Sequence, residues 1–348
     1  MRKGHESGED PVPNTVCRPR ARGTRYAVLG TVLLLACAPP PPDAPTVRVT
    51  IPAGSTFRAV TDSVAAHGLI ASRLWFRLLA RLRSADRTVK AGIYDLPDGA
   101  GAWVLLDILR SGRVATVRFT APEGLTLLEL AGLVEARLEI PRDTLLARAR
   151  DPALRERLGR AVPTLEGYLL PETYILPLPV SADALLQAMV AEFERRWNPA
   201  WNARLDSLGM TRTQLLTLAS IVEGEARHDD ERTTIAGVYS NRLQLGMLLQ
   251  ADPTVQYAVQ LATGERKTRL LFKDLAIESP YNTYRHPGLP PGPVNSPGIK
   301  SIEAALHPAS VPYLYFVAAE AGHHVFSRTL VEHNRAIEAI RRAEARSR

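Results

Sequence analysis

The sequence is short of cysteine, because its 348 residues hold only Cys17 and Cys37, both before the expected folded body. The rest of the chain therefore has no thiol for a zinc ribbon, an iron–sulfur cluster, a disulfide framework or a cysteine nucleophile. Long apolar runs are also scarce, since the one long uncharged stretch covers 26–38, and this excludes a multi-pass membrane protein. With 45% hydrophobic and 23% charged residues, the chain has the composition of a globular protein. Its length predicts roughly two domains.

Several nucleotide-binding and hydrolase motifs are absent as well. The sequence contains no P-loop, no Gly-x-Gly-x-x-Gly, no Gly-x-Ser-x-Gly and no His-Glu-x-x-His. Nothing therefore indicates a phosphate-binding loop, a nucleophile elbow or a zinc protease, and we expect neither a metal nor an organic cofactor. The adjacent His323 and His324 favour a turn or a strand start over a metal pair.

The net charge of +7 is concentrated at the two ends of the chain. Six Lys or Arg lie within 1–36, and five Arg lie within 335–348. No basic stripe interleaved with aromatic residues lies between them, so we expect no nucleic-acid partner. A mildly basic body suits other polyanions, such as a cell wall or an anionic membrane face.

The N-terminus has the pattern of an export signal. A basic segment (1–25) precedes the apolar run 26–38, and a proline-rich spacer (39–45) follows it. A helix of that run would span roughly 20 Å, short of the ~30 Å hydrocarbon core. Residues 34–37 resemble a bacterial lipobox, which makes Cys37 a lipidation candidate. A lipoprotein signal, an uncleaved short anchor and a buried helix remain open. The first two leave the arginines of residues 1–25 in the cytoplasm and everything after Pro42 outside the inner membrane.

An internal repeat follows the spacer. Residues 51–56 read IPAGST and residues 121–126 read APEGLT, each after a predicted strand and before a predicted helix. Ser55 and Thr126 lie near the helix starts, where a hydroxyl can cap free N–H groups. We expect a small α+β module over 46–142, which either packs the fold or binds glycan as LysM-like modules do. A mostly helical domain with long loops follows over 143–340, then a basic tail at 341–348.

Two glutamates stand out on the strongly helical segment 211–230. Leu215, Leu218 and Val222 form one apolar stripe, and Glu223 and Glu225 flank it on opposite sides, roughly 160° apart. They cannot share one face, and the spacing does not say which of them borders a cleft. A partly buried glutamate has a raised pKa, as a general acid requires, but both could also be solvated.

The segment 251–300 is rich in Pro, Gly, Asn, Thr and Tyr, and we expect it to be mostly loop. Its amides and aromatic rings suit a sugar-binding groove, although loop-capping and core roles are equally open. The polar and aromatic candidates in and near this segment are Asn241, Gln250, Asp252, Thr254, Tyr281, Asn282, Thr283, Tyr284, Asn295 and His307.

Longer motifs resemble one family. The segments that carry the resemblance are EGYLLPETY (166–174), LASIVEGEA (218–226), YSNRLQLGMLLQADPTVQYA (239–258), the stretch 281–298 and AALHPASVPYLYFVA (304–318). Together they resemble the YceG-like family of endolytic murein transglycosylases over about residues 45–340. This resemblance implies a lytic-transglycosylase-like catalytic domain that cuts nascent peptidoglycan strands between N-acetylmuramic acid and N-acetylglucosamine. The cut leaves a 1,6-anhydromuramoyl end and ends strand elongation.

The resemblance also implies roles for particular residues. Glu223 would be the catalytic glutamate, first as acid and then as base, with no second protein nucleophile because the C6 hydroxyl of the sugar attacks C1. Glycan strands, peptidoglycan synthases such as penicillin-binding proteins, and the membrane would be the partners. The alternative is a non-catalytic scaffold that binds peptidoglycan. Substrate-binding candidates are Glu166, Glu225, Gln250, Asp252, Thr254, Tyr281, Asn282 and Tyr284.

Overall fold

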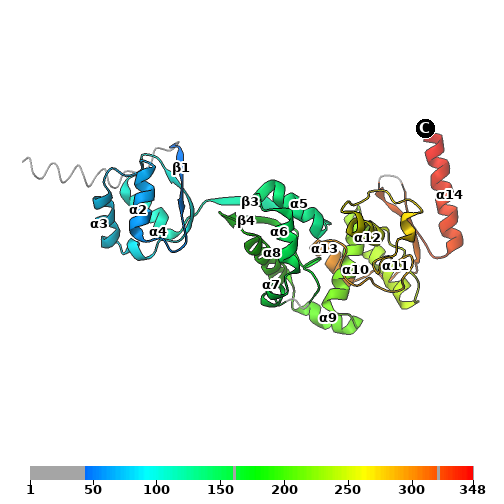
Figure 1. Cartoon of the computed structure of the whole chain (residues 1–348). Helices are drawn as coiled ribbons and strands as arrows, with labels where there is room; N and C mark the ends of the chain where they lie inside the picture. The colour runs from blue at the N-terminus through cyan, green and yellow to red at the C-terminus, as the bar shows by residue number, and fades with distance from the viewer. Residues whose placement is uncertain (1–43, 160–161, 320–321, 348) are drawn as a thin grey trace, which may run out of the picture. The chain divides into compact units, whose positions relative to one another are not determined.

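The computed structural model describes residues 44–159, 162–319 and 322–347, and these fall into two compact units (Figure 1). The first unit ends at Ala115 and the second begins at Thr116. The apolar segment 26–38 and Cys37 lie outside the described residues, so their role stays a prediction. Within the described ranges, no helix has the length and apolarity needed to span a bilayer.

The first unit packs helices on a two-stranded antiparallel sheet. Val49 faces Tyr94 across the sheet, and both are fully buried beneath Phe76 and Leu105. The predicted strand–helix–helix–strand order is confirmed. The elements are β1 (Thr46–Ile51), α2 (Phe57–Ala66), α3 (Arg73–Leu82), a short 3-10 turn (Ala85–Arg87), β2 (Gly92–Pro97) and α4 (Ala102–Ser111).

The second unit is mostly helical with two small antiparallel sheets, so the chain mixes helix and sheet as expected. Its first half contains β3 (Thr116–Thr120), α5 (Leu127–Leu138), α6 (Arg142–Arg150), α7 (Pro152–Arg157), β4 (Thr173–Pro177), α8 (Ala182–Arg196) and α9 (Ala200–Leu208). Its second half contains α10 (Arg212–Glu225), η2 (Asp229–Glu231), α11 (Arg232–Gln244), α12 (Asp252–Thr263), η3 (Asp274–Ala276), α13 (Ile299–Leu306), β5 (Tyr315–Ala318), β6 (His324–Ser327) and α14 (Leu330–Ser347).

The units divide earlier than the module boundary that we expected at residue 142. β3 pairs with β4, which places Phe119 opposite Tyr174 in the core of the second unit. α5 packs on α6 in the same core. The second copy of the repeat therefore belongs to the second unit, because its strand has its partner there.

Both copies of the repeat nevertheless fold alike. Gly54 and Gly124 take positive φ angles of 75° and 74°, a turn that favours glycine. Thr56 and Thr126 then cap the following helices by accepting a backbone N–H three residues on. The cap of the first copy is thus Thr56 and not its neighbour Ser55.

α10 is the central helix of the second unit and packs against α11, α12 and α13 (Figure 1). Thr211 and Gln214 form a capping box at its start, and every residue from Leu215 to Val222 is buried. From Leu215 onward the helix is therefore covered on every side until its last turn, where Glu223 and Glu225 lie.

The loop expected over 251–300 contains a helix that the sequence interpretation missed. α12 runs for 12 residues and buries Val255, Ala258 and Val259 at helical spacing. The rest of the segment is irregular apart from η3 and the start of α13. The proline and amide content masked this apolar spacing.

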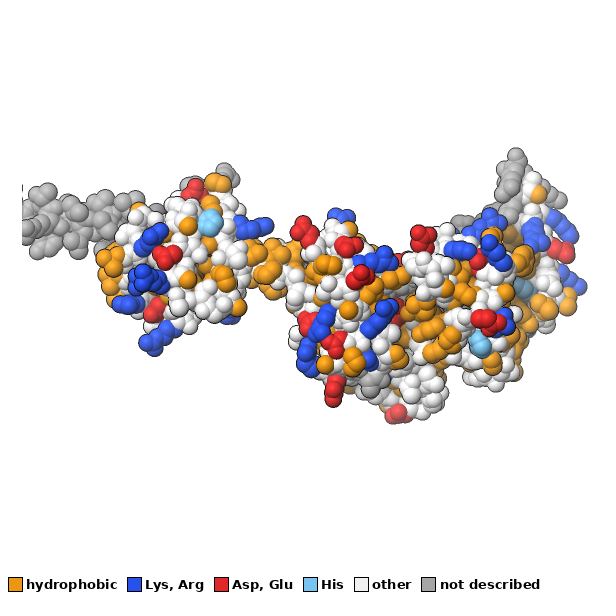
Figure 2. Space-filling view, in the orientation of Figure 1, with side chains coloured by type: hydrophobic (Ala, Val, Ile, Leu, Met, Phe, Trp, Pro, Cys, Tyr) orange, Lys and Arg blue, Asp and Glu red, His pale blue; other side chains and the backbone are white. Residues whose placement is uncertain are grey.

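The surface of the second unit mixes charges of both signs. On the face seen in Figure 2, acidic and basic side chains lie next to one another, with apolar side chains between them. That face presents no continuous basic stripe of the kind that follows a nucleic-acid backbone.

Candidate active site

Glu223 lies in the last turn of α10, and its side chain is only 7% exposed. Its Oε2 accepts hydrogen bonds from Arg232 Nη1 at 3.1 Å and from the Gly298 backbone N–H at 3.0 Å. Gly298 is the N-cap residue of α13, so the carboxylate also faces the positive end of that helix. A charged carboxylate is therefore well stabilised at this position.

Arg232 continues a chain of alternating charges away from Glu223. Its Nε donates to Asp229 Oδ1 at 3.0 Å, and its Nη1 also donates to the buried Ser301. Lys300 pairs with the other oxygen of Asp229. The hydrogen bonds from Lys300 and Arg232 lower the pKa of Asp229. A hollow of about 340 Å³ lies beside these groups, lined by Trp201, Asp229, Arg232, Thr233, Lys300, Glu303, Ala304 and His307.

A second carboxyl, that of Glu123, reaches the same place from the loop between β3 and α5. Two backbone hydrogen bonds tie this loop to the segment before α13, from Gly124 N–H to Ser296 O and from Ser296 N–H to Leu125 O. A β-carbon on Gly298 would lie 1.9 Å from Glu123 Oε1, so the carboxyl rests against the Gly298 Cα. A β-carbon on Gly124 would lie 3.7 Å from Glu223 Cγ. Both glutamates thus meet at Gly298.

Sequence reasoning did not select Glu123 or Arg232. The signal for Glu123 was present in the repeat, because the first copy has Ala53 at the position where the second has Glu123. No comparable difference in the sequence pointed to Arg232. Its partners Glu223 and Ser301 are distant in sequence, and only the folded chain brings them together.

Glu225 faces a different hollow, as the helical spacing predicted. This hollow measures about 190 Å³ and is lined by Glu225, Tyr239, Arg242, Leu249, Gln250, Phe316, Ala318 and His324. The Tyr239 hydroxyl donates to Glu225 Oε1 at 2.8 Å. Burial raises the pKa of Glu225 to about 7. Of the candidates from the loop, Gln250 lines this hollow.

The other loop candidates divide into exposed and enclosed residues. The partly exposed Tyr284 donates its hydroxyl to Asp252 Oδ1 at 2.7 Å, and the Asp252 backbone also bonds to Glu225. Thr254 and Asn282 are fully buried. The Thr254 hydroxyl bonds within the fold, and the Asn282 amide donates to two backbone carbonyls. These two residues hold the loop in place and present no polar group to a ligand.

Glu166 and Tyr281 lie together at a third hollow of about 320 Å³. Glu166 is 5% exposed and accepts the Leu127 N–H at 2.9 Å and the Tyr257 hydroxyl at 3.1 Å. Burial raises the pKa of Glu166 to about 7. The sequence candidates therefore occupy three separate places in the second unit, with Glu223, Glu225 and Glu166 one at each.

The raised pKa of Glu166 predicts a pH-dependent stability. Its unfolded pKa is near 4.5, so between about pH 4.5 and 7 the folded state binds more protons and stability falls as pH rises. We expect this loss to be on the order of 2–3 kcal/mol between pH 5 and pH 8. Glu166→Gln should remove that part of the slope in urea unfolding at the two pH values. If the free energy of unfolding changed equally with pH in Glu166→Gln and in the wild type, the raised pKa of Glu166 would be contradicted.

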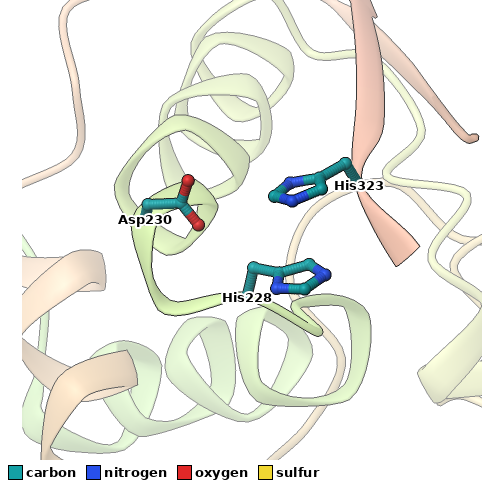
Figure 3. A group of neighbouring side chains, drawn as sticks. All are labelled: His228, Asp230 and His323. Carbon is teal, nitrogen blue, oxygen red and sulfur yellow. The ribbon is translucent and has the colours of Figure 1, made fainter. Parts of the chain in front are cut away.

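His228, Asp230 and His323 form the one group of potential metal ligands found among the described residues, with donor atoms within 4.8 Å of one another (Figure 3). Asp230 points toward the two imidazoles, which stack face to face at 3.9 Å. Nitrogen lone pairs lie in the ring planes, so stacked rings do not direct them at one ion. The group could hold a metal only after a ring rotates. His324, beside His323, begins β6 as the sequence indicated.

The comparisons with known proteins decide the family. The model of the YceG-like family matches residues 49–339. The chain belongs to this family. It is 34% identical to a protein of Bacillus subtilis (strain 168) named endolytic murein transglycosylase, over 84% of both chains. It is 31% identical to a protein of that name from Streptococcus pneumoniae serotype 2, where the match covers 78% of this chain and 54% of the relative.

A solved YceG-like structure agrees with this assignment. The crystal structure of a YceG-like protein from Listeria monocytogenes matches 83% of this chain and 98% of its own, with 33% identity and a TM-score of 0.58. The family match over residues 49–339 includes both copies of the repeat, so the first unit belongs to the family as well as the second.

Proposed function

We propose that this chain is an endolytic peptidoglycan lyase with Glu223 as its essential carboxyl. The observation that carries the proposal is the placement of Glu223. It is a nearly buried carboxylate at the end of the helix whose residues Leu215 to Val222 are all buried, held by Arg232 and by the N-terminus of α13. The names of the Bacillus and Streptococcus relatives support the substrate class.

The proposed reaction breaks the bond from C1 of N-acetylmuramic acid to the next N-acetylglucosamine. The leaving oxygen takes a proton, and the C6 hydroxyl of the same muramic acid loses one as its oxygen bonds to C1. Because the nucleophile is part of the substrate, the reaction gains effective molarity and needs no protein nucleophile. A rigid carboxyl able to exchange protons is what the enzyme must supply.

The other proposed features follow from the same activity. The substrate lies outside the cytoplasm, so we place both units on that side, with residues 26–38 as the anchor or signal. Glu225 and Gln250 line one hollow, and Asp252 contacts Glu225 and accepts the hydroxyl of Tyr284, so we assign the binding of sugar hydroxyls to this place. The first unit, which contains most of the module expected to be LysM-like, either contacts glycan or only packs the fold, and synthases are the expected neighbours on nascent strands.

Product analysis tests this proposal. Purified, uncrosslinked glycan strands are incubated with the chain, and the fragments are weighed by mass spectrometry. We expect internal fragments that end in 1,6-anhydromuramic acid, each lighter by one water molecule than a hydrolysed end. Reducing muramic acid ends would instead mean hydrolysis with a water nucleophile. Strand binding without any cleavage would favour the scaffold alternative.

A further inference from the structure

Helix α3 of the first unit presents a line of leucines to solvent. Leu74, Leu78 and Leu82 follow one another at intervals of four residues and are 79%, 48% and 71% exposed. The opposite side of the helix buries Phe76 and Leu79 in the core. Within the described part of the first unit, these leucines are the large apolar side chains that remain exposed. Three of them on one line indicate a surface that meets a partner.

Arginines border the line of leucines. At 100° per residue, Arg81 lies about 20° from Leu74 around the helix axis, and Arg77 lies about 60° from it. Arg73, one turn earlier, pairs with Asp62 at 3.5 Å. Arg77 and Arg81 have no acidic partner among the residues that the structure describes, so their charges are available to an outside group.

The positive charge continues beyond the end of α3. The segment 73–90 contains six Lys or Arg and a single acidic residue, Asp86. On the face seen in Figure 2, apolar side chains lie at the α3 edge of the first unit, with basic side chains beside them. A surface that combines leucines with unpaired arginines fits a bilayer, whose interior is apolar and whose headgroups carry negative charge.

The other occupants fit this face less well. A second copy of the chain would bring two clusters of arginines together, and like charges repel across an interface. A glycan strand presents hydroxyl and acetamido groups, to which leucines offer neither donors nor acceptors. An anionic membrane is the occupant that uses both the apolar and the basic side chains.

The chain before the first unit is short enough to keep this unit near a membrane. Seven residues, 39–45, separate the apolar run 26–38 from β1, and they reach at most about 25 Å. With 26–38 as the proposed anchor or lipoprotein signal, the unit stays within about its own diameter of the bilayer. A tether of this length gives a local concentration on the order of mM, so even a weak surface contact would be occupied.

We propose that the α3 face formed by Leu74, Leu78, Leu82, Arg77 and Arg81 docks on the anionic surface of a lipid bilayer. The leucines enter the boundary between headgroups and acyl chains, while the guanidinium groups stay with the lipid phosphates. The first unit thereby gains a second attachment beside the N-terminal one. This inference concerns attachment alone and shares with the proposed function only the location outside the cytoplasm.

Vesicle binding by residues 44–348 tests the face without the N-terminal segment. This part contains both units, and the core of the first lies between Val49 and Leu109. Thermal unfolding shows that it is folded. We expect it to bind vesicles of phosphatidylglycerol and phosphatidylcholine at least about tenfold more strongly than phosphatidylcholine alone, and more weakly at high salt. Equal binding to both vesicles, or binding to neither at millimolar lipid, would overturn the proposal.

The arginines are tested by Arg77→Gln combined with Arg81→Gln. Each arginine near an anionic surface strengthens binding about fivefold, so we expect the pair of changes to weaken it about tenfold or more. The matched control is Arg110→Gln with Arg113→Gln, which removes the same charge from two arginines that share Asp107. Equal loss in the control would mean that net charge, rather than the α3 face, attracts the vesicles.

The leucines are tested by Leu74→Gln, Leu78→Gln and Leu82→Gln together. Glutamine is a good helix former, so the helix should persist while the apolar line is lost. We expect vesicle binding to weaken about tenfold or more. The matched control carries the same change at three leucines of the second unit that are at least half exposed, Leu245, Leu261 and Leu271. Unchanged binding by the α3 variant would overturn the proposal.

A single labelled position distinguishes docking through α3 from attraction of the chain as a whole. Both natural cysteines precede residue 44, so Leu78→Cys carries the one thiol of the part tested. A polarity-sensitive fluorophore there should shift its emission to the blue on anionic vesicles. The same label on Thr50→Cys, which faces away from the core in β1, should not. A label at position 78 that is already shielded without vesicles would mean that protein covers α3, and the proposal would fail.

The two proposals of this article fail separately. Cleavage of purified strands needs no membrane, so the α3 variants should form anhydromuramoyl ends at the rate of the unchanged chain. A chain that cleaves strands but does not bind anionic vesicles would overturn the docking proposal alone. A chain that docks through α3 but leaves strands intact would overturn the lyase proposal alone.

Discussion

Glu223→Gln is expected to lower the rate of strand cleavage about 10³-fold or more, with the fold retained. Glutamine has the shape of glutamate but cannot accept the C6-hydroxyl proton. It can still accept the hydrogen bonds of Arg232 and Gly298 through its amide oxygen. The loss should therefore fall on kcat and leave strand binding close to that of the wild type.

The measurement is the appearance of anhydromuramoyl ends over time, at enzyme concentrations high enough to detect a variant about 10⁴-fold slower. Binding of glycan strands is measured on the same samples. Glu156→Gln, at an exposed position on α7, serves as the matched control. Cleavage by Glu223→Gln at more than a tenth of the wild-type rate would rule out Glu223 as the essential carboxyl.

The second large effect concerns Arg232. Its side chain is 10% exposed and contacts Glu223, Asp229 and Ser301. Removing one partner of a buried ion pair leaves the other charge uncompensated, which typically costs about 3–5 kcal/mol. We expect Arg232→Met to destabilise the second unit by about 3 kcal/mol and to reduce cleavage strongly, because Glu223 loses a donor that fixes its position.

A double-mutant cycle distinguishes the ion pair from simple loss of packing. Urea unfolding is measured for the wild type, Arg232→Met, Glu223→Gln and the combination. If the charge of Glu223 is the main partner, Arg232→Met should cost less in the Glu223→Gln background, by about 1 kcal/mol or more. Additive costs would mean that Asp229 and Ser301, rather than Glu223, account for the stabilising effect of Arg232.

Local sequence patterns predicted most elements of the fold. Apolar spacing indicated α10, and the repeat indicated β1, β3 and the helices that follow them. The pairing of β3 with β4 could not be predicted, since it depends on contacts between strands that lie far apart in the sequence. That pairing is also why the units divide at Ala115 rather than at residue 142.

The site was predictable only in part, for the same reason. Helical geometry correctly indicated that Glu223 and Glu225 face different surroundings, but it could not tell which of them meets a second carboxyl. That depends on the loop of Glu123 lying against Gly298, a contact between distant parts of the chain. Asn282 and Thr254 looked like ligand-binding residues by type, and only burial shows that their polar groups are used within the fold.

The way the second unit joins distant segments has a consequence for the timing of activity. Glu123, Glu223 and Gly298 come from three stretches of the chain, and the bonds of Ser296 to Gly124 and Leu125 link the first to the last. During synthesis, a nascent chain that has not yet reached α13 holds neither carboxyl in its final place. In the proposed location outside the cytoplasm, the site would therefore be complete only after the chain up to α13 had been exported and had folded onto the rest.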